Sequence, residues 1–523
     1  MKRAIIIVFL CVFQFLGAHR ANSQNVTNPD STLHEFLRSL KGDPLTLQLA
    51  IAHALEHSTD VRRSEASYLA AGGTRRREAG LFDPYLFFNL QYLDQDQPTA
   101  SVFAGASVLS TQQTLSRTGL QLTLPIGTQL QLAVNSVNLS TNSVYAFLNP
   151  EYDAFGSLSL RQPLLGGFAA SARKNLTHSE RELDAAKARY DQVVLATGAD
   201  VERAYWDLYA SERDFGVQQL TRDRAAAFLK EAETRAATGL IGPNQVANAR
   251  SFLAEQDLAL IDREELFDAR SDRLASMIGV RPAGGQSRFL PADEPPGDFT
   301  IDSVDVLVDH VLKNNLDLKA ASEEIEAANT MAEAAGWELL PSVDFVGSLG
   351  GNGLAGTPQD VYSFTGDTLR TDRGGSFGSS LQQVAHREYP TWSVGVEVSI
   401  PIGLRPGLGE RDRLEAEAVG ARERYIETSR RLEERVRSAH RELVHGKRRL
   451  EAARRGVEAA QDQVRIGIIE FRNGRTTAFE LVTLGEDFAT AQRRYSEALV
   501  HTAKAAATLR ELTSGVYTGT STR

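Results

Sequence analysis

Two long stretches without proline dominate the hydrophobic pattern of this chain, residues 172–238 and residues 410–473. Each is followed by a glycine, Gly239 or Gly474, beyond which a second helical pattern begins. At about 1.5 Å per residue, a helix of about 65 residues would be roughly 100 Å long, which exceeds the usual globular helix. The apolar runs within both stretches are too short and too charged to cross a bilayer. We therefore predict two long coiled-coil hairpins.

Shorter segments alternate apolar and polar residues, which is the period of a β-strand with one apolar face. Three of them lie in the first half of the chain: residues 119–124, 130–138 and 155–160. We predict a further strand at residues 85–92 from its strand-like composition and its aromatic residues. Two lie in the second half: residues 342–348 and 392–400. The segment between these last two is rich in glycine, and we predict that it is a flexible surface loop. Its glycines include Gly350, Gly351, Gly353 and Gly356.

The order of helix, strands, long helix and second helix occurs twice. The first helical part and its copy are separated by 257 positions, as shown by His53 and His310, and by Pro84 and Pro341. The long helices are separated by 235 positions, as shown by Gly239 and Gly474, and by Leu208 and Leu443. Constant separations of this kind indicate an internal repeat.

The N-terminus resembles a secretory signal, because Lys2 and Arg3 precede an apolar run that is followed by small residues ending at Ser23. We divide the chain accordingly into a signal peptide, a first repeat, a linker rich in proline and glycine, a second repeat and a tail. Their bounds are residues 1–23, 24–281, 282–300, 301–514 and 515–523. The single cysteine, Cys11, lies inside the apolar run without a lipobox, so we expect neither a disulfide nor a lipid anchor in the mature chain.

The last helix carries a heptad seam in which apolar positions alternate steps of three and four. Its members are Leu481, Leu484, Phe488, Ala491, Tyr495, Ala498, Thr502, Ala505, Leu509 and Leu512. The matching seam of the first repeat is interrupted by Gln256, Arg263 and Arg270, so we expect it to be weaker.

The formal charge of −10 argues against nucleic acid as a partner, since such proteins normally carry a basic face.

Short alternating strands behind a signal peptide suggest an outer-membrane β-barrel, which carries aromatic residues at both membrane interfaces. We expect these girdle residues to be Phe82, Tyr85, Phe87, Phe88, Tyr92, Trp337, Tyr389 and Trp392. The strands of one chain are too few to close a barrel, and open sheet edges are not tolerated in lipid. Several chains must therefore contribute strands, with the long helices projecting into the periplasm.

The duplicated plan resembles the TolC-like outer-membrane efflux protein family. The resemblance rests on the two glycine-centred hairpins and on the strand exits at residues 162–167 and 401–403. It implies a mainly α-helical chain with membrane β-strands, assembled as a homotrimer whose β-barrel continues into a long periplasmic α-helical barrel. It also implies a passive conduit without catalysis or cofactor. Its partners would be outer-membrane lipid, a periplasmic adaptor and an inner-membrane pump of an efflux or type I secretion system.

In relatives the hairpin tips bind the adaptor and close the periplasmic mouth. Carried over to this chain, the tip and gate residues are Arg235, Gly239, Gln245, Phe471, Arg472, Gly474, Arg475, Glu480 and Thr483. Thr483 stands where relatives place a second acidic residue. Three copies of Glu480 near one axis would repel, so we expect some of them to have a raised pKa or to bind a cation.

The first repeat contains an extra pair of strands, residues 119–124 and 130–138. Relatives usually have four strands per chain and twelve per trimer. The extra pair raises this to six and eighteen, or else forms an extracellular hairpin above a twelve-stranded barrel, and we favour the hairpin.

His53, Glu56 and His57 match the H-x-x-E-H pattern of zinc proteases, in which two histidines one helical turn apart bind zinc. The repeat places Lys313 and Asn314 at the matching positions, so we expect an exposed helix without a metal.

The remaining alternative for the whole chain is a periplasmic coiled-coil scaffold or adaptor protein without a membrane barrel.

Overall fold

A computed structural model describes residues 31–362, 366–473 and 475–515. The expected signal peptide, Gly474 and residues 516–523 of the tail lie outside the described residues. The chain divides into two compact units. The helical unit comprises Met1–Glu65, Arg189–Leu318 and Thr428–Arg523, and the strand unit comprises Ala66–Ala188 and Lys319–Glu427. Each unit takes segments from both predicted repeats, so the compact units cut across the repeat boundaries, which stay a prediction.

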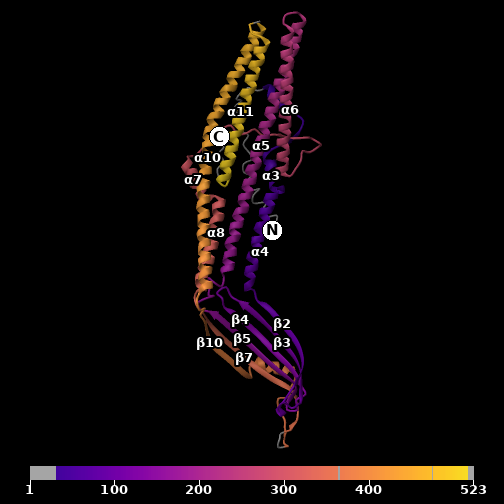
Figure 1. Cartoon of the computed structure of the whole chain (residues 1–523), viewed down its shortest axis with the longest axis vertical. Coiled ribbons are helices and arrows are strands. Elements are labelled where there is room, and N and C mark those ends of the chain that lie inside the picture. Colours follow the sequence, from indigo (N-terminus) through magenta and orange to yellow (C-terminus); the bar gives the residue numbers. More distant parts are fainter. Residues whose placement is uncertain (1–30, 363–365, 474, 516–523) are drawn as a thin grey trace. The chain divides into compact units, whose positions relative to one another are not determined.

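The strand unit is built on one six-stranded antiparallel sheet with the order β10-β7-β5-β4-β3-β2 (Figure 1). Its strands are β2 (Tyr85–Pro98), β3 (Val108–Thr123), β4 (Gln129–Thr141), β5 (Leu148–Pro163), β7 (Ser342–Pro358) and β10 (Tyr389–Ser399). All six predicted strands are confirmed, and most are longer than the alternating segments that indicated them. The added ends are largely polar or rich in glycine, so no apolar period marks them in the sequence.

The prediction of a glycine-rich surface loop after residue 348 is wrong, because Gly350, Gly351, Gly353 and Gly356 all belong to β7. These glycines permit close approach rather than flexibility. A Cβ atom on Gly353 would lie 2.0 Å from the carbonyl oxygen of Ser380 in helix α9 (Phe377–His386). A Cβ atom on Gly350 would lie 2.6 Å from the carbonyl oxygen of Gly156 in β5. The described part of the segment between β7 and β10 contains the short strands β8 (Val361–Tyr362) and β9 (Thr368–Leu369) and helix α9.

The extra pair of strands does not form a separate hairpin, whereas the number of strands in the barrel stays a prediction. β3 pairs with β2 along the whole of β2, from Tyr85 opposite Gln121 to Pro98 opposite Val108. β4 joins β3 to β5, so both extra strands lie inside the sheet. The 3₁₀ turns η2 (Gly80–Phe82) and η3 (Val102–Ala104) lie before β2 and between β2 and β3.

Two helical hairpins form most of the helical unit (Figure 1). The first joins α5 (Lys174–Ala237) to α6 (Pro243–Ile278), and the second joins α10 (Arg405–Arg472) to α11 (Ala478–Leu512). With 64 and 68 residues, α5 and α10 confirm the two long helices that the sequence predicts. The other helices are α2 (Ser31–Ser39), α3 (Leu47–His57), α4 (Thr59–Ala79), α7 (Val304–Asn314) and α8 (Leu316–Glu338).

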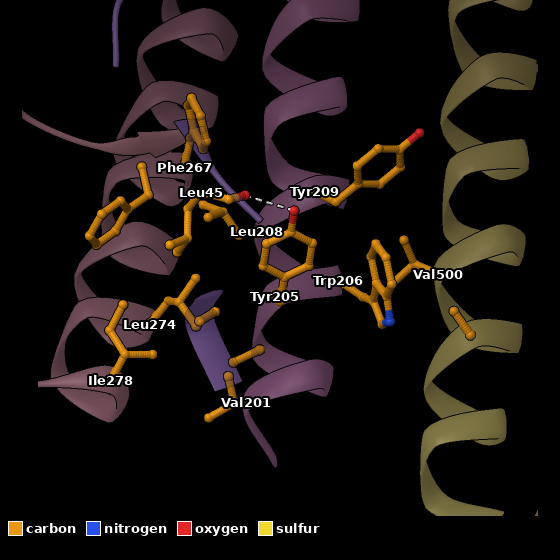
Figure 2. Close-up of a cluster of buried hydrophobic side chains, with 14 of the residues drawn as sticks. Leu45, Val201, Tyr205, Trp206, Leu208, Tyr209, Phe267, Leu274, Ile278 and Val500 are labelled. Atoms are coloured by element: carbon orange, nitrogen blue, oxygen red, sulfur yellow. Dashed lines mark hydrogen bonds between the residues drawn. The ribbon is translucent and has the colours of Figure 1, made fainter. Parts of the chain in front are cut away.

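The main core of the helical unit gathers around Tyr205 and Trp206 of α5 (Figure 2). Phe267, Leu274 and Ile278 of α6 are fully buried on one side of this cluster. The Tyr205 hydroxyl donates a hydrogen bond of 2.9 Å to the carbonyl oxygen of Leu45. This bond ties α5 to a small parallel sheet formed by β1 (Asp43–Leu45) and β6 (Phe289–Pro291).

The predicted linker, residues 282–300, therefore contains a packed strand. Phe289 of β6 is only 2% exposed and belongs to the main core. Arg288 lies 5.1 Å from the centre of the Phe267 ring and forms ion pairs with Glu264 and Asp268. The segment holds the end of α6 against β1.

Charged pairs connect α5 to α11 within the helical unit. Arg510 forms a bidentate pair with Glu202, whose carboxylate also accepts a hydrogen bond from the Trp206 indole. Lys504 bonds to Asp207 at 2.8 Å, which adds a second link between these helices. Glu202 is 4% exposed, and a buried carboxylate requires such partners to offset its lost hydration.

The heptad seam of α11 is confirmed, since all ten of its positions are buried or partly buried. Phe488 packs against Val457 and Ala460 of α10, with Tyr495 beside them. The residues at the tip of the second hairpin therefore lie at the end of a continuous packed seam between α10 and α11.

Candidate functional site

The tip of the first hairpin is set by Gly239, whose φ of +73° is the left-handed conformation that ends many helices. The N–H groups of Gly239 and Leu240 donate to the carbonyl oxygens of Ala236 and Arg235, both at 3.0 Å. A Cβ atom on Gly239 would meet nothing within 4 Å, so glycine is favoured here by its backbone conformation. Leu240, at the tip itself, is 75% exposed.

The tip of the second hairpin is set by a capping box at the start of α11. The Thr477 hydroxyl accepts from the Glu480 N–H, and the Glu480 carboxylate accepts from the Thr477 N–H at 2.9 Å. The Thr476 hydroxyl also donates to Glu480. These hydrogen bonds, with that from Thr476 the largest, lower the pKa of Glu480 in the single chain. The raised pKa predicted for a ring of three copies stays a prediction about the assembly.

A cation–π contact joins the ends of the two long helices. The Arg235 guanidinium of α5 lies 5.0 Å from the centre of the Phe471 ring of α10, and Arg235 also pairs with Glu231 at 2.6 Å. Two residues that the sequence assigns to the tips are therefore brought together from different hairpins. A contact of this kind contributes about 0.5–1 kcal/mol at an exposed site and more where water is excluded.

The Arg235–Phe471 contact stands at one end of a groove of about 340 Å³ between α5, α10 and α11. We call it the tip groove. It is lined by Arg224, Ala227, Phe228, Glu231, Val464, Ile468, Phe471, Leu481, Val482 and Gly485. Apolar side chains predominate, with Glu231 and Arg224 as the charged members.

Sequence reasoning missed most of the tip groove. Leu481 was recognised as part of the seam, but Phe228 and Arg224 of α5 carry no motif that distinguishes them from other helix residues. Only the packing of α5 against the second hairpin shows their role, since Arg224 also lies 5.9 Å from the centre of the Phe488 ring.

The other predicted tip residues do not all meet. Gln245 and Thr483 are exposed, and the Thr483 hydroxyl donates back to the Phe479 carbonyl oxygen on its own helix. The Arg475 side chain is exposed, while its backbone N–H donates to the Glu470 carbonyl oxygen at 2.9 Å. The side chain of Arg472 lies outside the described residues.

The six-stranded sheet of the strand unit forms a second candidate site, because its two faces differ in polarity. Trp392 and Leu86, on the two outer strands, are 70% and 71% exposed, and apolar residues of the four strands between them share their face. The other face carries glutamine and serine. The Tyr85 hydroxyl donates to Gln121 at 2.7 Å, and Arg117 lies over the Phe87 ring, so both aromatic residues face the polar side.

The H-x-x-E-H motif lies on α3, where the possible ligand atoms of His53, Glu56 and His57 all fall within 4.8 Å of one another. His57 Nδ1 is already 3.0 Å from the His53 carbonyl oxygen, and Glu56 is exposed. The expectation that this helix carries no metal stays a prediction. Separately, no helix among the described residues is long and apolar enough to cross a membrane.

The chain is similar to several known proteins. It is 21% identical over 341 residues to Nodulation protein T of Rhizobium leguminosarum bv. trifolii, which covers 64% of this chain and 67% of that protein. Its fold is similar to the outer-membrane channel OprN, with 17% identity, 90% of each chain covered and a TM-score of 0.60.

Two further solved structures share the fold. The CmeC outer membrane channel of Campylobacter jejuni is 13% identical over 90% of this chain and 86% of its own, with a TM-score of 0.61. VceC of Vibrio cholerae is 16% identical over 90% of this chain and 96% of its own, with a TM-score of 0.60. The sequence model of the outer membrane efflux protein family matches residues 51–280 and 307–515. With both hairpins and the sheet inside that match, the chain belongs to the outer membrane efflux protein family.

Proposed function

We propose that this outer-membrane efflux protein acts as a homotrimeric exit duct that projects into the periplasm. Three chains close a β-barrel in the outer membrane and continue it as a long helical barrel. The duct receives its cargo from an inner-membrane pump through a periplasmic adaptor, as in tripartite efflux or type I secretion. In this proposal the chain conducts its cargo passively, without catalysis.

The observation that carries this proposal is the six-stranded sheet with one exposed apolar face and one polar face. In water such a face would be an aggregation hazard, whereas in lipid it is the outer wall of a barrel. The sheet ends in strands β2 and β10, each paired on one side within the chain. Since lipid offers no hydrogen bonds to an open edge, further chains must pair with both.

The faces also refine the aromatic girdle. Phe88, Tyr92 and Trp392 are 67%, 63% and 70% exposed and alternate onto the apolar face, where they suit a membrane interface. Tyr85 and Phe87 point to the polar face, which favours a position inside the duct for both. Phe82, Trp337 and Tyr389 lie at the ends of elements, outside the central part of the sheet.

The hairpin tips serve as the gate and as the adaptor-binding site in this proposal. Leu240 and Phe479 are 75% and 66% exposed at the two tips, and exposed apolar residues of this size suit a protein partner. Arg235 and Phe471 hold the two hairpins of one chain together near the mouth. Opening would separate the hairpins and replace this contact with contacts to the adaptor.

The gate is tested by single-channel conductance of the purified protein in a planar bilayer. Arg235→Ala removes the contact between the hairpins, so the conductance of the closed channel should rise. Arg250→Ala is the matched control, because its ion pair with Glu233 at 3.4 Å stays within the first hairpin. Closed-state currents that are equal in both variants and the parent would place the gate elsewhere.

The assembly is tested by native mass spectrometry of the protein in detergent. Three copies of one chain are expected. A stable monomer would contradict the duct, since one sheet cannot close upon itself with both faces in their proper surroundings.

A further inference from the structure

The apolar face of the sheet is organised as one continuous row. Residues that are directly opposite one another in neighbouring strands share a face. Following the pairing from β10 to β2, the row consists of Trp392, Leu349, Leu158, Leu132, Leu120 and Leu86. All six are large and apolar, and their exposed fractions lie between 48% and 71%. We call this set the apolar row.

One residue further along, every strand presents a polar or amphipathic side chain to the opposite face. This polar row consists of Ser393, Ser348, Ser159, Gln131, Gln121 and Tyr85. Side chains of neighbouring members bond to one another at two places, between Ser348 and Ser393 and between Tyr85 and Gln121, both at 2.7 Å. The Ser159 hydroxyl also donates to the Gln131 carbonyl oxygen at 3.3 Å. At this height of the sheet, all six strands therefore place an apolar residue on one face and, at the next position, a polar or amphipathic residue on the other.

β3 and β4 contribute to both rows in the same way as the other four strands. Leu120 and Leu132 belong to the apolar row, and Gln121 and Gln131 belong to the polar row. With 16 and 13 residues, the two strands also exceed the 9 to 11 residues that cross a bilayer at about 45°. Their composition and length are those of membrane strands.

The turn between β3 and β4 lies at the end of the sheet where the long helix begins. The Ala169 N–H donates to the Ile126 carbonyl oxygen at 3.2 Å, just before α5. A Cβ atom on Gly127 would stand 2.6 Å from the Gly167 carbonyl oxygen. The turn therefore belongs to the periplasmic rim of the sheet, and β3 and β4 run the full height of the sheet on either side of it.

The outer strands of the sheet, β2 and β10, run antiparallel to each other, because five successive antiparallel pairings separate them. β10 of one chain can therefore pair with β2 of a second copy in the same antiparallel manner. The apolar row then continues from Trp392 of one copy to Leu86 of the next. In such an assembly, lipid would cover the apolar row, and the polar row would face the water inside.

We propose that all six strands enter the membrane, so that three copies of this chain form an eighteen-stranded barrel. The proposal rests on the trimer put forward above and goes beyond it in the number of strands. Barrel diameter grows roughly linearly with strand number, so this barrel would be about 1.5 times as wide as one of twelve strands. The cargo would leave through a pore of the width found in large aqueous porins.

The decisive experiment asks whether β4 lies in lipid. In a Cys11→Ser background, single cysteines replace Leu132 of the apolar row and Gln131 of the polar row. Leu158→Cys in β5 is the matched control, since β5 crosses the membrane whether the barrel has twelve or eighteen strands. The trimer is reconstituted into vesicles and treated with a membrane-impermeant maleimide. Quenching of a fluorescent label by brominated lipid is measured in parallel.

The expected result is that Leu132→Cys behaves as Leu158→Cys does. Both cysteines should react with the maleimide at least about tenfold more slowly than Gln131→Cys does, because lipid excludes water from that side of the strand. Both labels should be quenched by brominated lipid. If Leu132→Cys reacts as fast as Gln131→Cys and is not quenched, β3 and β4 lie outside the bilayer and the barrel has twelve strands.

The same samples separate this inference from the trimer on which it rests. Variants with one cysteine in β2 and one in β10 should give disulfide-linked trimers on oxidation. Two such variants, Leu86→Cys with Trp392→Cys and Leu86→Cys with Val394→Cys, test two registers of the pairing between chains. If only monomers appear in every pair and by native mass spectrometry, the duct itself is contradicted. Linked trimers with an accessible Leu132→Cys would contradict only the eighteen-stranded barrel.

Discussion

The two helical hairpins have matching lengths and a constant repeat separation, yet they fill their seams in different ways. In α5–α6, Phe267 is fully buried, with its ring centre 6.1 Å from that of Phe215. The matching residue 235 positions later is Thr502, which lies against Gly446 of α10. A Cβ atom on Gly446 would stand 2.7 Å from the Thr502 hydroxyl oxygen. One hairpin is packed by a ring and the other by close approach of its helices.

The hairpins differ in charge and in their tips as well. Glu212 is 6% exposed on α5, whereas the matching Lys447 on α10 is exposed and pairs with Asp298 at 3.1 Å. The N-cap of α6 is Gly242, without a side-chain cap, and the matching N-cap of α11 is Thr477. A repeated backbone plan therefore does not require repeated interactions, and each copy can be destabilised by a different substitution.

The largest effect is expected at the seam of the first hairpin. Phe267→Ala should lower the free energy of unfolding by about 3–5 kcal/mol, because it empties a fully buried ring site. Thr502→Ala, at the matching position, should cost only about 1 kcal/mol. Denaturant titration in detergent would measure both. Equal losses would show that the two seams are packed alike.

A pH-dependent effect of the order of 3 kcal/mol is expected at Glu212. Burial raises the pKa of this carboxyl to about 8, against about 4.3 in an unfolded chain. Between these values the unfolded chain has released the proton and the folded chain still holds it, so stability falls as pH rises through this window.

Glu212→Gln replaces the ionisable carboxyl with a neutral amide. The variant should therefore become more stable than the parent, increasingly so from pH 5 to about pH 8. The measurement is thermal unfolding at a series of pH values. Lys447→Gln is the matched control and should show no such trend in this range. A Glu212→Gln difference that is constant with pH would mean that the carboxyl is ionised in the folded protein.

A smaller effect is expected at the glycines of α10. Gly446→Ala forces a methyl group against fully buried Thr502 and should cost about 1–3 kcal/mol. Gly456→Ala meets nothing within 4 Å and should stabilise the helix by up to about 1 kcal/mol. Unfolding of the two variants side by side gives the sign of each change. If both stabilise, the close approach of α10 and α11 is not tight.

The smallest effect is expected at the two tips. Thr477→Ala should weaken the start of α11 by about 1 kcal/mol, because it removes the capping hydroxyl. Gly242→Thr should stabilise the start of α6 by a few tenths of a kcal/mol, because it supplies a cap and completes a capping box with Gln245. Amide hydrogen exchange at each tip would resolve both changes. Opposite signs at the two tips are expected, and loss of protection in both would contradict the capping argument.

Local sequence patterns were sufficient for the two long helices and for the existence of the six strands of the main sheet. The proline-free stretches that become α5 and α10, and the seam of α11 from Leu481 to Leu512, depend on periods of three and four residues. The alternation of Leu120 and Leu122, or of Val394 and Val396, depends on a period of two. Such patterns record which side of an element is buried, and this property is local to the element.

Partners that lie far apart in the sequence were decided only by the tertiary structure. No local pattern shows that Gly353 must admit the backbone of Ser380, so those glycines suggested a loop although they form a strand. The linker likewise gave no sign that Phe289 would enter the core through β6. The gate role of Glu480 rests on resemblance and stays a prediction.

The strands β3 and β4 show most clearly what the local sequence pattern determines and what only the tertiary structure determines. Alternation alone identified both strands and their apolar faces, because it reflects burial along one strand. It could not decide whether they stand apart or lie between β2 and β5, since the pairing of strands depends on contacts between distant residues. The register from Leu86 through Leu120 and Leu132 to Leu158 decided it, by placing four apolar side chains from four strands in one row.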